Sequence, residues 1–352
     1  MKPLLLYGLG LLCLGATILP FSKAGTWWVR ACDFPRIQIA VMTAATLAGI
    51  VAFIEISVLS AMLVFALLAC LVVQLAVILP YTRLWPIEAR GTRDAAGPRT
   101  LSLLIVNVLM ENRAADRLAE LVAAHDPDLI LAVETDAWWC QHLEGALPHH
   151  SARIAHPLSN TYGMMLLSRL ELVDPEVRFL LKADIPSIRT GVRLRSGDVI
   201  TLYGLHPEPP SPTEADTSLP RDAELVLAGR EIARSDRPAI IAGDLNDVAW
   251  SHVTRLFRRL SDMLDPRIGR GLYATFNARR PLLRWPLDHI FFTEDFRLVR
   301  LERMGFIGSD HFPILVELSY EPERADAQEA RVVVPGDRAM VRRKIRRARG
   351  SP

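Results

Sequence analysis

Acidic, amide and imidazole side chains stand at the ends of short apolar runs in the second part of this 352-residue chain. One such residue alone is usually a turn residue or a helix cap, but here the pattern recurs at the end of run after run. Strand ends and the loops that follow them are where α/β folds place binding and catalytic groups. The candidate site residues are Asn107, Glu134, His206, Asp244, Asn246, Asp288, Asp310 and His311.

The side-chain types in this set predict a site for a hard cation. Carboxylates accompanied by an amide oxygen are the ligands that suit Mg²⁺ or Mn²⁺. Only Cys140 lies in this part of the chain, whereas Cys13, Cys32 and Cys70 lie in the apolar N-terminal part. A disulfide framework or a thiolate zinc site is therefore not expected here. Because Mg²⁺ keeps several water ligands, two or three protein ligands suffice.

Spacing within two motifs separates functional from structural side chains. In Gly243-Asp244-Leu245-Asn246 the glycine permits an unusual turn, and the two-residue spacing places Asp244 and Asn246 on one side of an extended chain. The same alternation points Asp288 and His289 to opposite sides. We therefore interpret His289 as structural.

The elements that position these residues form an α/β domain over residues 100–320. An apolar run, a helical pattern and a second apolar run open it, as in a βαβ unit. Many strands with few helices between them predict two packed sheets with outer helices. Strands are expected near 101–108, 128–133, 163–167, 171–180, 188–194, 199–205, 239–242, 287–292 and 314–318, and helices near 113–124, 138–147, 219–233 and 250–260.

The first 82 residues are predicted to be a membrane region. Glu55 is the only charged residue between Ile37 and Thr82, and none lies between Leu4 and Phe21. At roughly 20 apolar residues per crossing, this length predicts three transmembrane helices, near 4–21, 37–54 and 57–80. A cleaved signal peptide is disfavoured because only Lys2 precedes the first run and no small-x-small cleavage site follows it. A soluble bundle is disfavoured because the runs lack a polar face.

Charge bears on the partner and on the membrane orientation. The formal net charge of +2 is too small to indicate a polyanionic partner such as nucleic acid. With three crossings the first loop and the domain share one side of the bilayer, and the basic residues on that side favour the cytoplasm by the positive-inside rule. These residues are Lys23, Arg30, Arg36, Arg83, Arg90, Arg93 and Arg99.

Two segments outside the domain are expected to lack a fold of their own. Residues 83–99, which contain glycines, a proline and several charges, are predicted to be a linker. Residues 321–352 alternate acids and bases and end in a basic run, which predicts a disordered, solvated tail. In the cytoplasm this tail would also suit anionic lipid, at roughly 1 kcal/mol per basic residue.

Taken in order, these segments resemble the endonuclease/exonuclease/phosphatase superfamily, which includes pancreatic deoxyribonuclease, sphingomyelinases and inositol polyphosphate phosphatases. The resemblance covers about residues 100–320, and its most specific parts are Gly243–Asn246 and Ser309–His311. It implies a four-layer α-β-β-α sandwich of two mixed sheets with outer helices, preceded here by the transmembrane bundle.

The resemblance also implies a metal site and a proton acceptor. Glu134 would be the principal ligand of Mg²⁺ or Mn²⁺, with Asn107 and Asp310 beside it as ligands or through bound water. Asp288 would orient and polarise His311, so that His311 takes a proton from the attacking water. The metal would stabilise charge that develops on the phosphate oxygens.

Three further residues receive roles from the resemblance. His206 would bind the scissile phosphate or protonate the leaving oxygen, and Asp244 and Asn246 would hold the nucleophile and phosphate in line. The presence of both His206 and His311 resembles the deoxyribonuclease and phospholipid or inositol phosphatase branch more than the abasic-site nucleases. Tyr162 and Arg169, which flank a family-like strand, are weaker site candidates.

Three apolar helices joined to such a domain resemble the bacterial membrane branch that contains the teicoplanin-resistance proteins. This resemblance implies a lipid-linked phosphate as substrate and a catalytic domain on the extracytoplasmic side of the membrane. We therefore expect a multi-pass, metal-dependent hydrolase of phosphate ester or pyrophosphate bonds on a lipid-linked substrate, because tethering raises the effective concentration of a substrate in the bilayer surface.

Two other functions stay open. A membrane-tethered DNA or RNA nuclease would need basic and aromatic residues beside the site. Arg279, Arg280, Arg284 and Trp285 could supply them, or could contact lipid headgroups instead. A noncatalytic module that binds a phosphorylated ligand is disfavoured, because every acid and histidine of the pattern is present. No protein partner is evident.

Overall fold

The computed structural model describes residues 2–55, 57–93, 97–235, 237–328 and 333–350. The chain forms two compact units. The helical unit comprises Met1–Pro86, Pro210–Ser218 and Gly269–Gly271, and the sandwich unit comprises Ile87–Pro209, Leu219–Ile268 and Leu272–Pro352. Residues 1 and 56 of the predicted membrane region, 94–96 of the predicted linker, and 329–332 and 351–352 of the predicted tail lie outside the described residues.

Among the residues that the structure describes, three helices are long and apolar enough to cross a membrane, over Pro3–Ser22, Arg36–Phe53 and Val58–Tyr81. They correspond to α1 (Lys2–Ile18), α3 (Arg36–Phe53) and α4 (Val58–Ile78), and a short helix, α2 (Trp27–Ala31), lies between α1 and α3. Large apolar side chains such as Phe65, which is 77% exposed, cover their outer faces. A lipid environment would accommodate these faces, so the helices support membrane association.

A buried network of polar side chains near α2 connects the helices of the helical unit with one another. Asp33 forms ion pairs with Arg30 (2.9 Å) and Arg36 (2.6 Å). Arg36 also donates to Gln74 Oε1 (3.5 Å). The amide nitrogen of Gln74 in turn donates to the hydroxyl of Thr17 (2.9 Å). Two of the arginines counted for membrane orientation are thus paired with a buried acid.

Two loop segments belong to the helical unit although they are distant in sequence. Trp27 N donates to Asp216 O (3.0 Å), and Ser218 N donates to Gly25 O (2.7 Å). Gly269 N donates to Pro80 O (2.9 Å). The loop after β7 (Val199–Leu205) therefore carries a segment that packs with the helices.

The sandwich unit contains two mixed sheets, as the sequence predicted. One has the order β10-β11-β1-β2-β4-β3, with β1 (Thr100–Asn107), β2 (Leu129–Val133), β3 (Ala152–His156), β4 (Met164–Ser168), β10 (Phe296–Arg303) and β11 (Ile314–Tyr320). The other has the order β5-β6-β7-β8-β9, with β5 (Glu171–Arg178), β6 (Ser187–Arg193), β7, β8 (Ala239–Asp244) and β9 (Asp288–Phe292). The pairs β1–β2 and β7–β8 are parallel and the others antiparallel.

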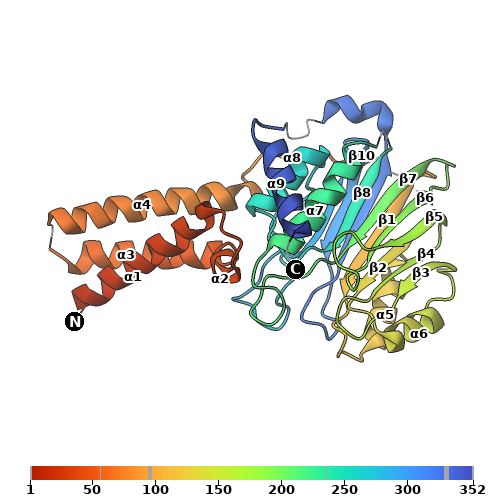
Figure 1. Ribbon diagram of the computed structural model, residues 1–352, viewed down its shortest axis with the longest axis horizontal. Helices are drawn as coiled ribbons and strands as arrows, with labels where there is room; N and C mark the ends of the chain where they lie inside the picture. Colours follow the sequence, from red (N-terminus) through yellow and green to blue (C-terminus); the bar gives the residue numbers. More distant parts are fainter. Residues whose placement is uncertain (1, 56, 94–96, 236, 329–332, 351–352) are drawn as a thin grey trace. The chain divides into compact units, whose positions relative to one another are not determined.

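Alternating side chains separate the layers. Leu103 and Ile105 of β1 pack in the core between the sheets with Leu202 of β7. Leu104 of β1 faces the other way, toward α5 (Ala115–His125) and α6 (Ala137–Ala146). On the second sheet, α7 (Leu219–Ile232) and α8 (His252–Ser261) cover the outer face. The four-layer α-β-β-α sandwich is confirmed (Figure 1).

The predicted linker, residues 83–99, is partly wrong, because its described residues from Ile87 onward pack as part of the sandwich unit. Ala89 is fully buried in the core, and Thr92 N donates to Leu298 O of β10 (3.0 Å). Glu88 forms an ion pair with buried Arg258 of α8. The sandwich unit therefore begins at Ile87, inside the predicted linker.

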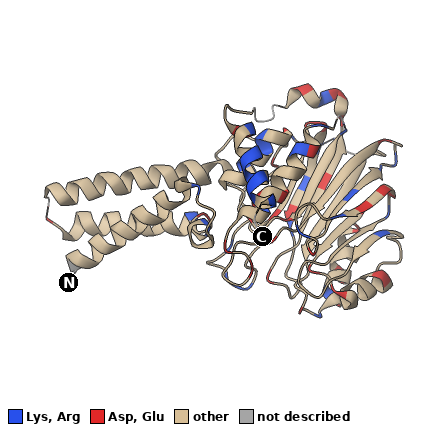
Figure 2. Cartoon of the chain, in the orientation of Figure 1, with Lys and Arg blue, Asp and Glu red and all other residues tan. Residues whose placement is uncertain are grey.

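The tail predicted to be disordered also differs, since it forms helix α9 (Asp337–Arg349). Val341 and Ile345 are buried with Leu256 of α8 and Val226 of α7, and their four-residue spacing makes an apolar stripe on one helix face. Asp337 pairs with Arg259 (2.7 Å), and Lys344 pairs with Asp222 (2.6 Å). The basic residues of α9 form the blue band in Figure 2.

Candidate active site

Strand direction places the predicted residues of the first sheet at one edge. Asn107 ends β1 and Glu134 follows β2, and these strands are parallel, so both side chains leave the sheet at the same edge. Strand β11 is antiparallel to β1, with Ile314 opposite Ile105. His311, just before β11, therefore returns to that edge.

The second sheet contributes in the same way. His206 follows β7 and Asp244 ends β8, which is parallel to β7. Strand β9 is antiparallel to β8, and its first residue, Asp288, lies directly opposite Asp244. Three predicted site residues thus meet at the corresponding edge of this sheet.

Asn107 links the two sheets. Its Nδ2 donates to Glu134 Oε1 (2.7 Å) on its own sheet and to Asp244 Oδ2 (3.1 Å) on the other. Its Oδ1 accepts from Leu109 N (2.9 Å), and Met110 N donates to Glu134 Oε2 (3.4 Å). One buried amide therefore holds two carboxylates close together.

His311 lies between two aspartates. Its Nδ1 is 2.7 Å from Asp288 Oδ2, and its Nε2 is 3.5 Å from Asp244 Oδ2. Burial by itself would lower the pKa of His311, but the charges of Asp288 and Asp244 and the Asp288 hydrogen bond raise this pKa to about 10. Burial favours the neutral acid at Asp288, but His311 holds the pKa of that carboxyl below its usual value.

The remaining predicted residues surround this pair. His206 Nε2 is 3.9 Å from Asp244 Oδ2, and burial together with the charge of His311 lowers the pKa of His206 to about 3. Asn246 N donates to Asp244 Oδ1 (2.9 Å). Asp310 is half-buried, and its charge raises the pKa of both Glu134 and His311. All eight predicted residues therefore lie in one region.

Backbone conformation at this edge is unusual. Gly243 has φ +138°, and a Cβ there would lie 2.0 Å from Leu205 O. Glu134 has φ +62° and Asn246 has φ +50°. Asparagine adopts this left-handed region readily, but a glutamate rarely does. A strained residue held by hydrogen bonds at a strand end is typical of functional sites.

Gly243→Ala should destabilise the protein and reduce any activity. The methyl group would push Leu205, and with it the end of β7, away from β8, at a cost of roughly 2–3 kcal/mol or more. We expect the midpoint of thermal unfolding to fall by about 5 °C or more. Gly145→Ala is the matched control, because Gly145 lies in α6 and a Cβ there would meet no atom within 4 Å. An unchanged midpoint for Gly243→Ala would contradict the close approach.

Sequence reasoning missed several residues that support the site. The hydroxyl of Thr275 accepts hydrogen bonds from Leu287 N (3.3 Å) and Asp288 N (3.2 Å). Buried Arg221 of α7 donates to Asn246 O (2.7 Å). Neither stands at the end of an apolar run, because each is brought to the site only by the packing of the sheets and α7. A charged residue on the buried face of the α7 pattern was the one available hint for Arg221.

Other interpretations can be checked in the same region. His289 is buried, with Nδ1 2.8 Å from Arg267 and Nε2 2.8 Å from Asp247 O, in agreement with a structural role. The Tyr162 ring lies 5.6 Å from that of His206. Arg169 follows the far end of β4 and pairs with Asp126, so it lies away from the site.

The donor set fits a hard divalent cation. Burial disfavours the charged forms of Glu134 and Asp244 and so raises the pKa of both carboxyls, and the neighbouring charges of Asp310 and Asp288, respectively, raise them further. Among the described residues, Asp288 Oδ1 and His206 Nδ1 are buried without a hydrogen-bond partner. Ligand atoms of Asp244, Asp288 and His311 also lie within 4.8 Å of one another.

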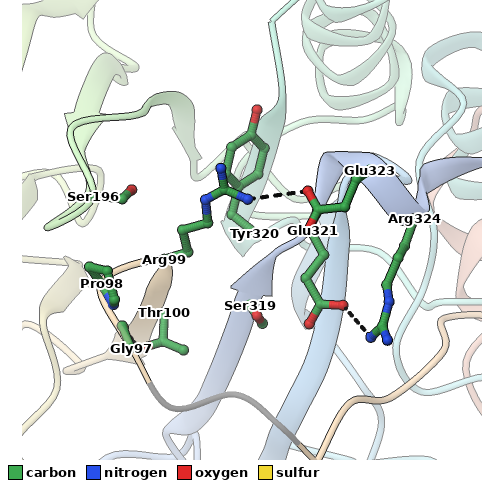
Figure 3. Close-up of a pocket in the computed structure, with 10 residues that line it drawn as sticks. All are labelled: Gly97, Pro98, Arg99, Thr100, Ser196, Ser319, Tyr320, Glu321, Glu323 and Arg324. Atoms are coloured by element: carbon green, nitrogen blue, oxygen red, sulfur yellow. Dashed lines mark hydrogen bonds and ion pairs between the residues drawn. The ribbon is translucent and has the colours of Figure 1, made fainter.

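A hollow of about 440 Å³ at the other end of the strands is not part of this site (Figure 3). It includes Thr100, the first residue of β1, which is about 23 Å from Asn107 at 3.3 Å per residue. Its arginines are already paired, Arg99 with Glu323 (3.2 Å) and Arg324 with Glu321 (2.9 Å). It therefore offers little free charge to a ligand.

The fold and the site define a class of protein, namely an α/β sandwich with acids, amides and histidines gathered at one edge of its stacked sheets. Residues 104–311, more than half of the chain, match the model of the Endonuclease/Exonuclease/phosphatase family. The chain belongs to this family, whose members are hydrolases that act on phosphoester bonds.

Solved structures agree on the fold. They include D. rerio TDP2 complexed with single strand DNA product (18% identity, TM-score 0.51, 62% of this chain and 99% of that chain). A family protein from Bacteroides thetaiotaomicron matches with 18% identity, TM-score 0.53, and 64% and 97% coverage. The human Nocturnin catalytic domain with bound sulfate anion matches with 15% identity, TM-score 0.52, and 66% and 96% coverage. A search of the curated proteins finds no match.

Proposed function

We propose that the chain is a multi-pass membrane protein that hydrolyses phosphate ester or pyrophosphate bonds of a lipid-linked substrate, with Mg²⁺ or Mn²⁺. The observation that carries this proposal is the buried cluster in which Asn107 joins Glu134 to Asp244 beside the His311–Asp288 pair. Three helices of membrane length in the same chain favour a substrate in the bilayer surface. The resemblance to the teicoplanin-resistance branch supports the same class of substrate.

Each side chain of the cluster has a proposed task. Asp288 fixes the ring of His311 through Nδ1, so that Nε2 can exchange a proton with the attacking water. His206, which is neutral and has an unbonded Nδ1 among the described residues, can hydrogen-bond a phosphate oxygen or the leaving oxygen. Asp244 and Asn246 position the water and the phosphate in line.

Glu134, with Asn107 and Asp310 beside it, would hold the metal. When bound, a divalent cation would stabilise negative charge on the phosphate oxygens. It would also offset the negative charge of the carboxylates, which raises the pKa of His311. Asn107 currently presents its amide nitrogen to both carboxylates, so its oxygen would face a cation only after a rotation of the amide.

A membrane-tethered nuclease is the second candidate. One structure with this fold, D. rerio TDP2, was solved with single strand DNA product, and the arginine-rich segment before β9 is the feature of this chain that favours it. The two candidates differ in the substrate that delivers the phosphate rather than in the chemistry at phosphorus.

The test is turnover by purified full-length protein of a panel that contains a polyprenyl diphosphate, a phospholipid and plasmid or single-stranded DNA. Each substrate is assayed with Mg²⁺, with Mn²⁺ and with EDTA. We expect metal-dependent release of phosphate from the lipids, at a rate at least tenfold above any cleavage of DNA. Cleavage of DNA without lipid turnover would overturn the lipid assignment in favour of the nuclease.

A further inference from the structure

The segment before β9 is a hairpin fixed to the site. Phe276 N donates to Trp285 O (3.0 Å), and Asn277 N donates to Leu283 O (3.1 Å). Ala278 N donates to Asp310 O (2.6 Å), and the Phe276 ring lies 4.9 Å from the ring of His311. We call residues 276–285 the site hairpin. Whatever its tip contacts is thereby held next to Asp310 and His311.

Four arginines gather on and beside the site hairpin. Arg279 donates to Gly308 O (2.9 Å), and Arg280 is exposed. The guanidinium groups of Arg284 and Arg303 both lie over the ring of Phe312, at 4.9 and 4.5 Å. Burial and the charge of Arg284 lower the pKa of Arg303.

The four arginines share one feature, which is that no acidic side chain in the described part of the chain pairs with them. Among the residues that the structure describes, none of the four forms an ion pair with a carboxylate, whereas Arg178, Arg193, Arg258 and Arg267 each do. Clustered positive charge without acidic partners attracts anions and costs free energy in their absence. An anionic surface beside the site would complement this cluster.

The same region exposes large apolar side chains. At the hairpin tip Leu282 is 84% exposed and Leu283 is 38% exposed. Phe306, which is 45% exposed, contacts Phe312 with ring centroids 6.4 Å apart. Single-stranded nucleic acid is bound by stacking on aromatic rings, which Phe306 could supply but Leu282 and Leu283 could not. Leucines beside arginines instead suit the boundary between lipid headgroups and acyl chains.

We propose that the site hairpin, with Arg303 and Phe306, binds an anionic bilayer surface and presents a lipid phosphate to the site. Leu282 and Leu283 enter the headgroup boundary, and the arginines contact lipid phosphates. This inference rests on the proposed function and specifies its substrate as an amphiphile taken from the membrane surface. It also gives the arginine-rich segment a reason to carry leucines at its tip.

The kinetic test uses full-length protein in proteoliposomes that contain anionic phospholipid. Two substrates share a diphosphate headgroup, one with a long polyprenyl chain and one short enough to be water-soluble. For Leu282→Gln/Leu283→Gln and for Arg279→Gln/Arg280→Gln we expect the ratio of kcat/KM for the long-chain substrate to that for the short-chain substrate to fall at least tenfold. Arg342→Gln/Arg346→Gln, which removes two exposed arginines of α9, is the matched control and should keep the wild-type ratio.

A contact measurement separates this inference from the proposed function. In a variant without the four native cysteines, a fluorophore on Leu282→Cys should be quenched by phospholipids brominated in their acyl chains. Quenching without any turnover would support the hairpin and count against the proposed function. Lipid turnover with no quenching and an unchanged ratio for the leucine variant would overturn the hairpin inference and leave the function standing. Equal losses on both substrates would also overturn it.

Discussion

His311→Ala should lower kcat for phosphoester hydrolysis by roughly 10²- to 10⁴-fold, the usual contribution of a positioned proton-transfer group. The structure gives this residue its weight because Asp288 holds Nδ1 at 2.7 Å and leaves Nε2 directed at Asp244. Asp288→Asn should also lower kcat roughly 10²-fold, since a neutral amide cannot stabilise the positive charge of the protonated His311 ring. Steady-state kinetics of both variants, with circular dichroism to verify folding, measure these losses.

The two losses should not add. If Asp288 acts only through His311, the variant His311→Ala/Asp288→Asn should be no more than about threefold slower than His311→Ala, because the pair acts as a unit. Asp265→Asn, at another buried acid that pairs with Arg267 (2.8 Å), is a control for loss of a buried charge. Additive losses would show that Asp288 has a role independent of the histidine.

Glu134→Gln should raise the Mg²⁺ concentration needed for half-maximal activity at least tenfold. Burial already raises the pKa of this carboxyl, and removal of its charge leaves the proposed cation with a neutral amide as its nearest ligand. Titration of activity with Mg²⁺ after treatment with EDTA measures the shift. Glu111→Gln is the matched control, because Glu111 is exposed three residues after Val108 and has no described partner.

A normal Mg²⁺ titration for Glu134→Gln would exclude Glu134 as the principal ligand. The carboxylates of Asp244 and Asp288 would then be the better candidates, since their oxygens lie with a nitrogen of His311 within 4.8 Å. The hydrogen bond between Asp288 Oδ2 and His311 Nδ1 could persist in that arrangement, because Asp288 Oδ1 has no hydrogen-bond partner among the described residues.

The strands that carry the site were predictable because each is a buried apolar run with a polar residue at its end. The sequence did not predict strands β3 and β10, and the reason differs between them. Ala152–His156 of β3 is a half-exposed edge strand without an apolar run. Phe296–Arg303 of β10 alternates apolar residues with arginine and glutamate but contains a bulge between Leu298 and Arg300, which breaks the two-residue period.

The candidate site was predictable in composition but not in geometry. Motif order identified Asp244, Asp288 and His311, whereas the hydrogen bond from Asn107 across to Asp244 exists only because two sheets stack. The left-handed conformation of Glu134 likewise has no sequence signal, since glutamate rarely adopts it. The exposure of Leu282, on which the proposal of a lipid surface rests, also emerged only from the fold.

The most direct measurement is Mg²⁺-dependent turnover of a lipid diphosphate by Glu134→Gln/His311→Ala beside the wild-type protein. The proposed site lies where Asn107 joins Glu134 to Asp244, and His311 is held by Asp288 at the same edge. With both residues replaced in a folded protein, we expect no release of phosphate above the rate without enzyme. Turnover that survives in this variant would show that the chemistry takes place elsewhere.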